Sequence, residues 1–142
     1  MRRPDPDLVR RAVAEAETVI MTTIEEGASS RLVTRPMSLL PEVFEGRLRL
    51  IAPRASRCVR NLAEHSAASV AILTSTQTLT ITGSAGVVTD TELLTALWRP
   101  ALDRWIRDGP HHAAMIVVTA LEVRHWASSG SREAHDRASQ EP

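Results

Sequence analysis

A cluster of arginines in the first half of the chain has the residue types needed to bind an anion. Seven arginines fall within residues 31–60: Arg31, Arg35, Arg47, Arg49, Arg54, Arg57 and Arg60. A guanidinium is planar and binds two phosphate oxygens at once, so the cluster favours a phosphate-bearing ligand. All 17 basic residues of the chain are arginine, which excludes Schiff-base and lysine-nucleophile mechanisms.

The loop Pro53–Arg57 is the most informative part of this cluster, because a short helix is predicted to follow from Ser56 to about Glu64. Free N–H groups at a helix start, a serine hydroxyl and neighbouring guanidinium groups together form a phosphate site. The alternative is that Ser56 only caps the helix and the arginines cover a solvated face. Spacing alone leaves this alternative open.

Other side chains offer less chemistry. His111 and His112 are adjacent and lack a companion cysteine or carboxylate cluster, so no metal site is predicted. Cys58 is the only cysteine, which excludes an internal disulfide and favours the reducing cytoplasm. No residue has the setting of a general acid or base, so the catalytic residues stay unassigned.

The elements that must position the arginines follow a regular order. An apolar stripe at helical spacing follows Asp5, and Thr89 and Glu92 have the spacing of a capping box that starts a longer helix. Pro100 is expected to kink or split that helix. Strand-like patterns cover residues 18–24, 31–40, 47–52, 69–73 and 78–89, and residues 115–126 supply the closing strands. Pro36 predicts an edge, a bulge or a ligand-facing stretch within its strand.

This order predicts a mainly β protein with helices, between the all-β and α+β classes, built on an antiparallel barrel. We expect one domain over residues 1–128 and a polar, flexible tail over residues 129–142. Acidic and basic residues balance at 17 each, and no apolar run is long enough to span a bilayer. Neither a nucleic acid nor a membrane is therefore expected as a partner.

Four stretches, taken in order, resemble the general stress protein 26 branch of the pyridoxamine 5'-phosphate oxidase-like flavoproteins. They are VIMTTIEEGASSRLVTRPM, LRLIAPRASRCVRNL, LTITGSAGVVTD, and ALWRPALDRWIRDGP followed by AMIVVTALEVRHW. Together they cover roughly residues 8 to 128. The resemblance implies a six-stranded antiparallel split β-barrel of the FMN-binding type with flanking helices. It also implies a homodimer whose two subunits form the FMN sites at their interface.

The same resemblance implies roles for particular residues. Arg35 would bind the phosphate or ribityl part of FMN, and Pro36 and Met37 would present their backbone beside the isoalloxazine. Ser56 and Arg57 would hold the phosphate.

Three further positions complete the implied site. Thr78 would face the flavin. Cys58 stands where relatives carry a basic residue, and Ala52 stands where they often carry a small polar one. These two departures would weaken FMN binding unless other arginines compensate.

The predicted function is that of an FMN-binding flavoprotein, an oxidoreductase of unknown substrate. Oxidation of pyridoxamine 5'-phosphate itself is not expected, because the longer C-terminal segment that clasps that substrate in full-length oxidases is not recognisable. One alternative is a split barrel that binds haem or a deazaflavin. Another is a cofactor-free dimeric interaction or regulatory protein.

Overall fold

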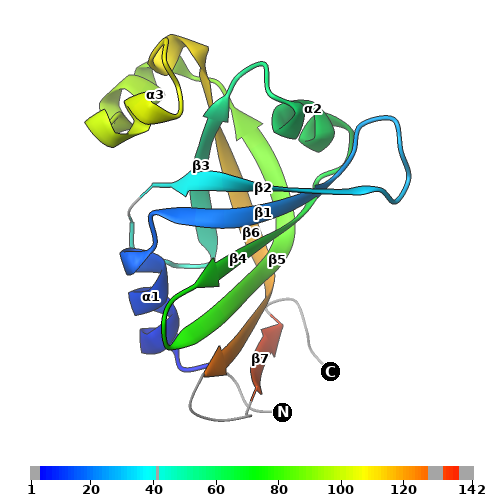
Figure 1. Ribbon diagram of the computed structural model, residues 1–142, viewed down its shortest axis with the longest axis vertical. Helices are drawn as coiled ribbons and strands as arrows, with labels where there is room; N and C mark the ends of the chain where they lie inside the picture. The colour runs from blue at the N-terminus through cyan, green and yellow to red at the C-terminus, as the bar shows by residue number, and fades with distance from the viewer. Residues whose placement is uncertain (1–3, 41, 128–132, 138–142) are drawn as a thin grey trace.

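Six antiparallel strands close into a barrel in the computed structural model, which describes residues 4–40, 42–127 and 133–137 (Figure 1). The strands are β1 Thr18–Ile24, β2 Leu32–Leu39, β3 Arg47–Pro53, β4 Ala67–Leu73, β5 Gln77–Val88 and β6 Ala113–Ala127. Their order is β3-β2-β1-β4-β5-β6, and pairing of β3 with β6 closes the barrel. The predicted six-stranded antiparallel barrel is therefore confirmed.

Alternation along the strands fills the barrel interior. In β1, Val19, Met21 and Thr23 are buried while their neighbours are not, as expected when successive side chains point to opposite faces. Inward residues of the other strands complete this core, among them Leu48, Leu50, Val70, Ile72, Leu79, Ile81, Ile116 and Val118. Burial of this apolar surface is the main force that holds the barrel together.

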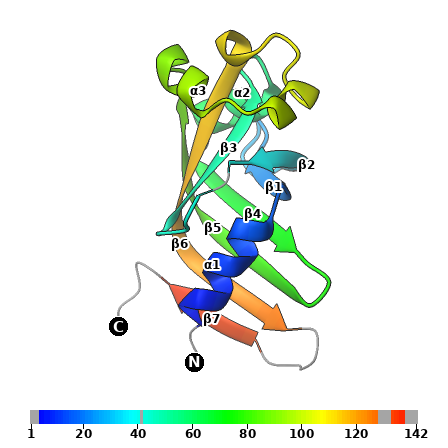
Figure 2. The same cartoon turned by 90° about the vertical axis from the view of Figure 1, so that its left-hand side faces the viewer.

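Two helices pack against the same core from outside the ring of strands (Figure 2). Helix α1, Pro6–Glu15, begins after Asp5, whose carboxylate accepts the Asp7 N–H at 2.9 Å. It buries Val9, Ala12 and Val13. Helix α2, Arg57–Glu64, buries Cys58, Asn61 and Leu62. None of the helices in the described ranges is long and apolar enough to cross a membrane.

A second, smaller core lies outside the barrel, where β6 emerges at the top of Figure 1. Helix α3, Thr91–Leu97, is followed by the short 3₁₀ helices η1, Pro100–Arg104, and η2, Pro110–His112. Pro100 therefore splits the helix, as predicted. The residues of this core are Leu40, Ile51, Leu94, Leu102, Ile106, Ala113 and Met115.

The predicted capping box at Thr89 is wrong by one residue. Asp90 is the N-cap of α3, and its Oδ1 accepts the N–H groups of Glu92 and Leu93 at 3.0 and 3.2 Å. A carboxylate beside a helix start also interacts favourably with the helix dipole, which favours Asp90 over the neighbouring hydroxyl.

β6 is one long strand rather than a closing pair. It pairs with β5 along almost its whole length and with β3 through its first seven residues. The register of β5 and β6 shifts between Thr82 and Gly83, and a side chain at Gly83 would collide with the carbonyl of Thr119. The glycine thus permits the close backbone approach at this bulge.

Beyond the barrel, the second half of β6 pairs with a short strand, β7 Glu133–Arg137. This strand lies within the segment predicted to be a polar, flexible tail. An extended strand leaves a row of N–H and C=O groups without partners, and β7 supplies hydrogen bonds to that edge. The rest of the predicted tail lies outside the described residues.

The strand that carries Arg35 is paired unevenly. β2 pairs with β1 over seven residues, but with β3 only through Ser38 and Leu39. The stretch around Pro36 is therefore open on the β3 side, which agrees with the predicted edge. Proline lacks an N–H group, so such a position costs it no ladder hydrogen bond.

Candidate functional site

The inward face of β2 carries an arginine with an unsatisfied buried donor. Arg35 lies opposite Met21 of β1 in the strand register. Its Nε is buried and has no hydrogen-bond partner within the part of the chain that the structure describes. Buried polar atoms are nearly always hydrogen-bonded, so an orphaned guanidinium nitrogen is an expected place for a ligand anion.

Cys58 of α2 lies next to this arginine but belongs to the core. Its side chain is buried, and its Sγ lies 3.9 Å from the Sδ of Met21. Burial raises the pKa of the Cys58 thiol, and the positive charge of Arg35 opposes this increase in part. The position where the resemblance implies a basic residue is thus filled by a neutral thiol that packs as a small apolar side chain.

The N-terminus of α2 supplies donors close to Cys58. The Oγ of Ser56 accepts the Val59 N–H at 3.4 Å, which makes Ser56 the N-cap. The N–H groups of Arg57 and Cys58 have no acceptor inside the helix, because the first turn of any α-helix leaves its donors free. Capping by Ser56 and anion binding by these amides are therefore compatible with each other.

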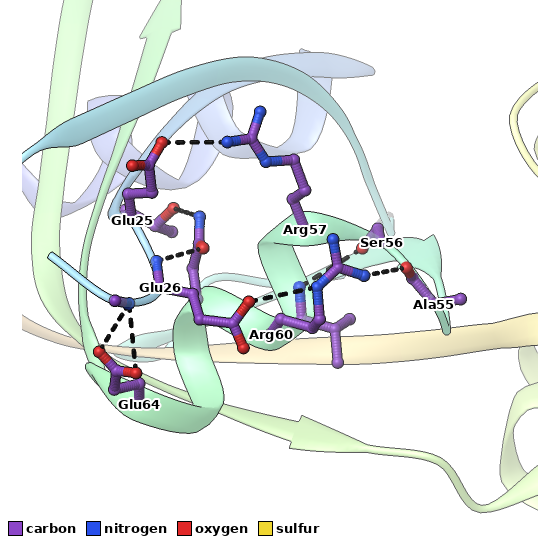
Figure 3. Close-up of polar contacts among 11 residues, drawn as sticks. Glu25, Glu26, Ala55, Ser56, Arg57, Arg60 and Glu64 are labelled. Atoms are coloured by element: carbon purple, nitrogen blue, oxygen red, sulfur yellow. Dashed lines mark hydrogen bonds and ion pairs between the residues drawn. The ribbon is translucent and has the colours of Figure 1, made fainter.

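The guanidinium groups around α2 are already paired (Figure 3). Arg57 donates to Glu25 at 3.0 Å, and Arg31 donates to the other carboxylate oxygen of Glu25 at 2.9 Å. Arg60 lies 3.4 Å from the Glu26 carboxylate and also donates to the Ala55 carbonyl at 2.7 Å. Arg57, which was predicted to hold the phosphate, and its neighbour Arg60 thus already contact carboxylates of the chain itself.

These carboxylates come from the tip of the β1–β2 hairpin, residues 25–28, which is fastened to α2. Asn61 accepts the Glu26 N–H at 2.8 Å and donates to Thr23 Oγ1 at 3.1 Å. Glu64 accepts the Gly27 N–H at 2.9 Å. Sequence reasoning placed the hairpin tip between two predicted strands and missed this docking. The sequence pattern that could have predicted this docking is an acidic pair at the turn and a run of arginines some thirty residues later.

The remaining predicted site residues are placed differently. Pro36 is exposed, whereas the side chain of Met37 is buried in the barrel. Thr78 lies at the start of β5, opposite Leu73, and Ala85 of the same strand donates to the Ser66 carbonyl just after α2. Seven residues of strand span roughly 23 Å, so within one chain Thr78 lies far from the N-terminus of α2.

The structure therefore gathers four of the seven predicted residues around the start of α2. They are Arg35, Ser56, Arg57 and Cys58, and Pro36 and Met37 continue along β2 from the first of them. Thr78 does not join them in the single chain.

A groove that sequence reasoning did not predict lies further along β2. It has a volume of about 180 Å³ and is lined by Glu17 and the start of β1, by the end of β2 and Leu40, and by η1 with Arg99 and Trp105 beside it. The guanidinium groups of Arg99 and Arg104, both on the wall, have no hydrogen bond or ion pair with any residue in the described ranges. Trp105 completes the wall and is 41 % exposed. Two unpaired guanidinium groups beside an indole suit a planar anionic molecule.

The structure shows no cluster of three or more histidine, cysteine, aspartate or glutamate side chains that could hold a metal ion within the residues it describes. His111 and His112 are exposed on η2.

Solved structures share this fold. General stress protein 26 from Bacillus anthracis str. Sterne is 15% identical, with a TM-score of 0.76 over 93% of this chain and 97% of that chain. A protein related to general stress protein 26 from Clostridium acetobutylicum is 13% identical, with a TM-score of 0.79 over 94% and 96%. A pyridoxamine 5'-phosphate oxidase-related, FMN binding protein from Nostoc punctiforme is 12% identical, with a TM-score of 0.66 over 90% and 83%. At these identities the likeness is one of fold.

No curated protein matches this chain in sequence. A family model does: the one described as pyridoxamine 5'-phosphate oxidase like matches residues 5–136. This match covers nearly all of the described barrel, and it agrees with the resemblance drawn from the ordered motifs. The chain belongs to the pyridoxamine 5'-phosphate oxidase-like family.

Proposed function

We propose that this protein is an FMN-binding oxidoreductase whose cofactor phosphate lies at the start of α2. The observation that carries the proposal is the buried Nε of Arg35, which has no partner among the described residues. A phosphate oxygen would satisfy this donor. One structural relative is named as an FMN binding protein, and the single, buried Cys58 agrees with a cytoplasmic location.

The residues present fit a phosphate group. Arg35 and the free N–H groups of Arg57 and Cys58 would donate to its oxygens, and the guanidinium of Arg57 would add a charge-assisted contact. Pro36 and Met37 lead along β2 away from this position, so their backbone would lie beside the ring system. FMN, when bound, supplies the electron transfer, while the protein supplies position and electrostatics.

The groove at η1 is the proposed place for the substrate. It contains Ser38 and Leu40, so it follows directly on the stretch of β2 that would face the flavin ring. Arg99 and Arg104 would attract a negatively charged substrate, and Trp105 would stack on a planar one. This arrangement favours an anionic, planar substrate.

A homodimer is the proposed assembly. The outer face of β1, β2 and β4 carries apolar side chains, of which Leu32 and Leu73 are 67% and 66% exposed. No described helix buries them. Thr78 lies beside Leu73 in the strand register, so a second copy seated on this face would meet Thr78. A site composed of two subunits would then contain Thr78 together with the other predicted residues.

The test of the proposed function is spectroscopic. Purified protein should show the two visible flavin bands, and denaturation should release a compound that co-migrates with FMN. Riboflavin, which lacks the phosphate, should bind more weakly by at least tenfold, since a charge-assisted contact is worth about 1.5–3 kcal/mol. A haem Soret band would favour the haem alternative. A colourless protein that ignores added FMN would favour the cofactor-free interaction protein.

The assembly has its own test. Light scattering at micromolar concentration should give the mass of a dimer, and Leu73→Glu should lower it to that of a monomer. Val43→Glu is the matched control, because Val43 is equally exposed at 66% but lies between β2 and β3. A monomeric mass for the unaltered protein would remove the two-subunit site.

A further inference from the structure

The surface between α2 and the hairpin tip (residues 25–28) has a balanced set of charges. Three guanidinium groups, from Arg31, Arg57 and Arg60, lie among three carboxylates, from Glu25, Glu26 and Glu64. Figure 3 shows the side chain of Arg57 reaching toward Glu25. The proposed anion site thus contains its own anion.

Glu25 is the central carboxylate of this set. Its side chain is 19% exposed and accepts from both Arg57 and Arg31, one on each oxygen. The Arg57 side chain is 62% exposed, so its guanidinium remains accessible to a ligand. An arriving phosphate would meet an arginine that is reachable but already paired.

We propose that Glu25 is a positioning residue that holds Arg57 as an internal counter-anion, and that a phosphate-bearing ligand binds by displacing Glu25 from Arg57. This inference rests on the proposed function, because it concerns the same phosphate position. It assigns a regulatory role to a hairpin turn that lies 32 residues away from Arg57 in sequence.

The contacts of the hairpin tip make such an exchange local. Asn61 holds the Glu26 N–H, and Glu64 holds the Gly27 N–H. Neither contact uses Arg57, so the tip stays docked when Arg57 changes partner. Glu25 also keeps its contact with Arg31, which lowers the cost of releasing Arg57. Only one side chain has to rotate.

The exchange of Glu25 for a phosphate at Arg57 affects how tightly the phosphate binds. A phosphate that binds Arg57 gains one charge-assisted pair and loses another, so the net gain is smaller than for a free guanidinium. Removing the carboxylate should therefore strengthen phosphate binding. An ion pair of this exposure predicts a gain of about two- to fivefold, and screening should reduce the gain as salt rises.

The experiment compares FMN dissociation constants of the full chain and four variants: Glu25→Gln, Arg57→Ala, the combination of these two, and Glu26→Gln. Glu25→Gln should bind FMN about two- to fivefold more tightly at low salt, and the gain should disappear when Arg57→Ala is added. Glu26→Gln is the matched control. Its partner Arg60 keeps the hydrogen bond to the Ala55 carbonyl, so this variant should gain less. A merely structural role of Glu25 would not produce a gain that depends on Arg57.

A second measurement uses the unaltered protein and does not depend on the folding of any variant. The side-chain Nε–H of Arg57 is followed by NMR during titration with FMN and, separately, with inorganic phosphate. The signal should shift on saturation, while the amides of Glu26 and Gly27 stay protected from hydrogen exchange.

The outcomes separate this inference from the proposed function. FMN binding that leaves the Arg57 signal in place, or that is equally tight in Glu25→Gln, overturns the displacement but keeps the flavin. Absence of FMN binding together with phosphate binding that Glu25→Gln strengthens through Arg57 supports the displacement and removes the flavin. Absence of binding of both FMN and inorganic phosphate overturns both.

Discussion

The arginines beside α2 differ from those beside η1 in whether their guanidinium groups contact a carboxylate. Arg57 and Arg60 are paired with carboxylates of the hairpin tip. Arg99 and Arg104 line a groove and have no such partner in the described part of the chain. An anion that approaches a paired guanidinium competes with the carboxylate already bound there, whereas an unpaired guanidinium offers no such competitor. The two regions therefore differ in the competition that an incoming anion meets.

The two regions also differ in what lies beneath them. Under the start of α2, Cys58 and Met21 extend the barrel core up to Arg35. Under η1, Leu102 belongs to the smaller core outside the barrel. A new charge at position 58 would therefore enter the main core, while a new charge on η1 can stay in solvent.

The largest expected effect is a loss of stability when a lysine is introduced beside α2, compared with a lysine introduced on η1. Cys58→Lys introduces the basic residue type that the resemblance implies here, but it places an ammonium where the present side chain is 2% exposed. We expect the free energy of unfolding to fall by about 3 kcal/mol, because an unpaired charge is buried. Ala101→Lys is the control on exposed η1 and should change it by less than about 0.5 kcal/mol. Urea denaturation of the two variants measures both values.

If Cys58→Lys keeps its stability and binds FMN more tightly, the lysine reaches the phosphate and the core position of Cys58 does not matter. The unaltered thiol offers an independent check. Because burial raises the pKa of the Cys58 thiol, iodoacetamide should alkylate it slowly at pH 8 in the native protein and fast after unfolding.

The next effect tests what keeps the α2 arginines paired. Asn61 is 1% exposed, accepts the Glu26 N–H and donates to the Thr23 hydroxyl. Asn61→Ala should lower the free energy of unfolding by about 2 kcal/mol, since it leaves buried polar groups without partners. Thr34→Ala, which removes an exposed hydroxyl pair with Thr22, is the control and should cost less than about 0.5 kcal/mol. Equal losses in thermal denaturation would show that the docking is not held by Asn61.

Much of the barrel was predictable from the sequence because its signals are local. Alternation in β1, the cap at Ser56 and the split at Pro100 each depend on a few neighbouring residues. The resemblance implied a six-stranded split barrel, but the strand order and the closure by β3 and β6 were not predicted, because pairing of distant strands leaves no local pattern.

The candidate site was less predictable, since its contacts are long-range. The cluster of arginines was visible, but their pairing joins Glu25 to Arg57 across 32 positions. The groove joins the end of β2 to η1, about 60 residues later. Even the placement of Cys58 depends on which face of an eight-residue helix meets the barrel. Such facts follow from tertiary packing and not from spacing.

An intermediate effect concerns the unpaired arginines. Replacing both Arg99 and Arg104 with Ala should weaken binding of benzoate, a planar carboxylate, by about tenfold. Tryptophan fluorescence measures the binding, and Trp105→Phe identifies the responding indole. Arg57→Ala should leave benzoate affinity unchanged, because Arg57 lies at the other region. If Arg57→Ala weakens benzoate and the groove variant does not, the assignment of the two regions is reversed.

The smallest expected effect distinguishes a carboxylate that contacts an arginine from one that only lies near it. Asp103 belongs to η1, like Arg104, but its Oδ1 accepts the Trp98 Nε1–H at 2.9 Å instead of contacting an arginine. Asp103→Asn keeps an acceptor for Trp98 and removes the charge. At about 0.15 M salt, exposed charges that do not touch interact weakly, so benzoate affinity should rise by less than about twofold. Glu25→Gln, which removes a carboxylate in direct contact with Arg57, should have the larger effect on its own ligand. A gain at Asp103→Asn as large as that at Glu25→Gln would mean that overall charge governs both regions, and the distinction between paired and unpaired arginines would lose its meaning.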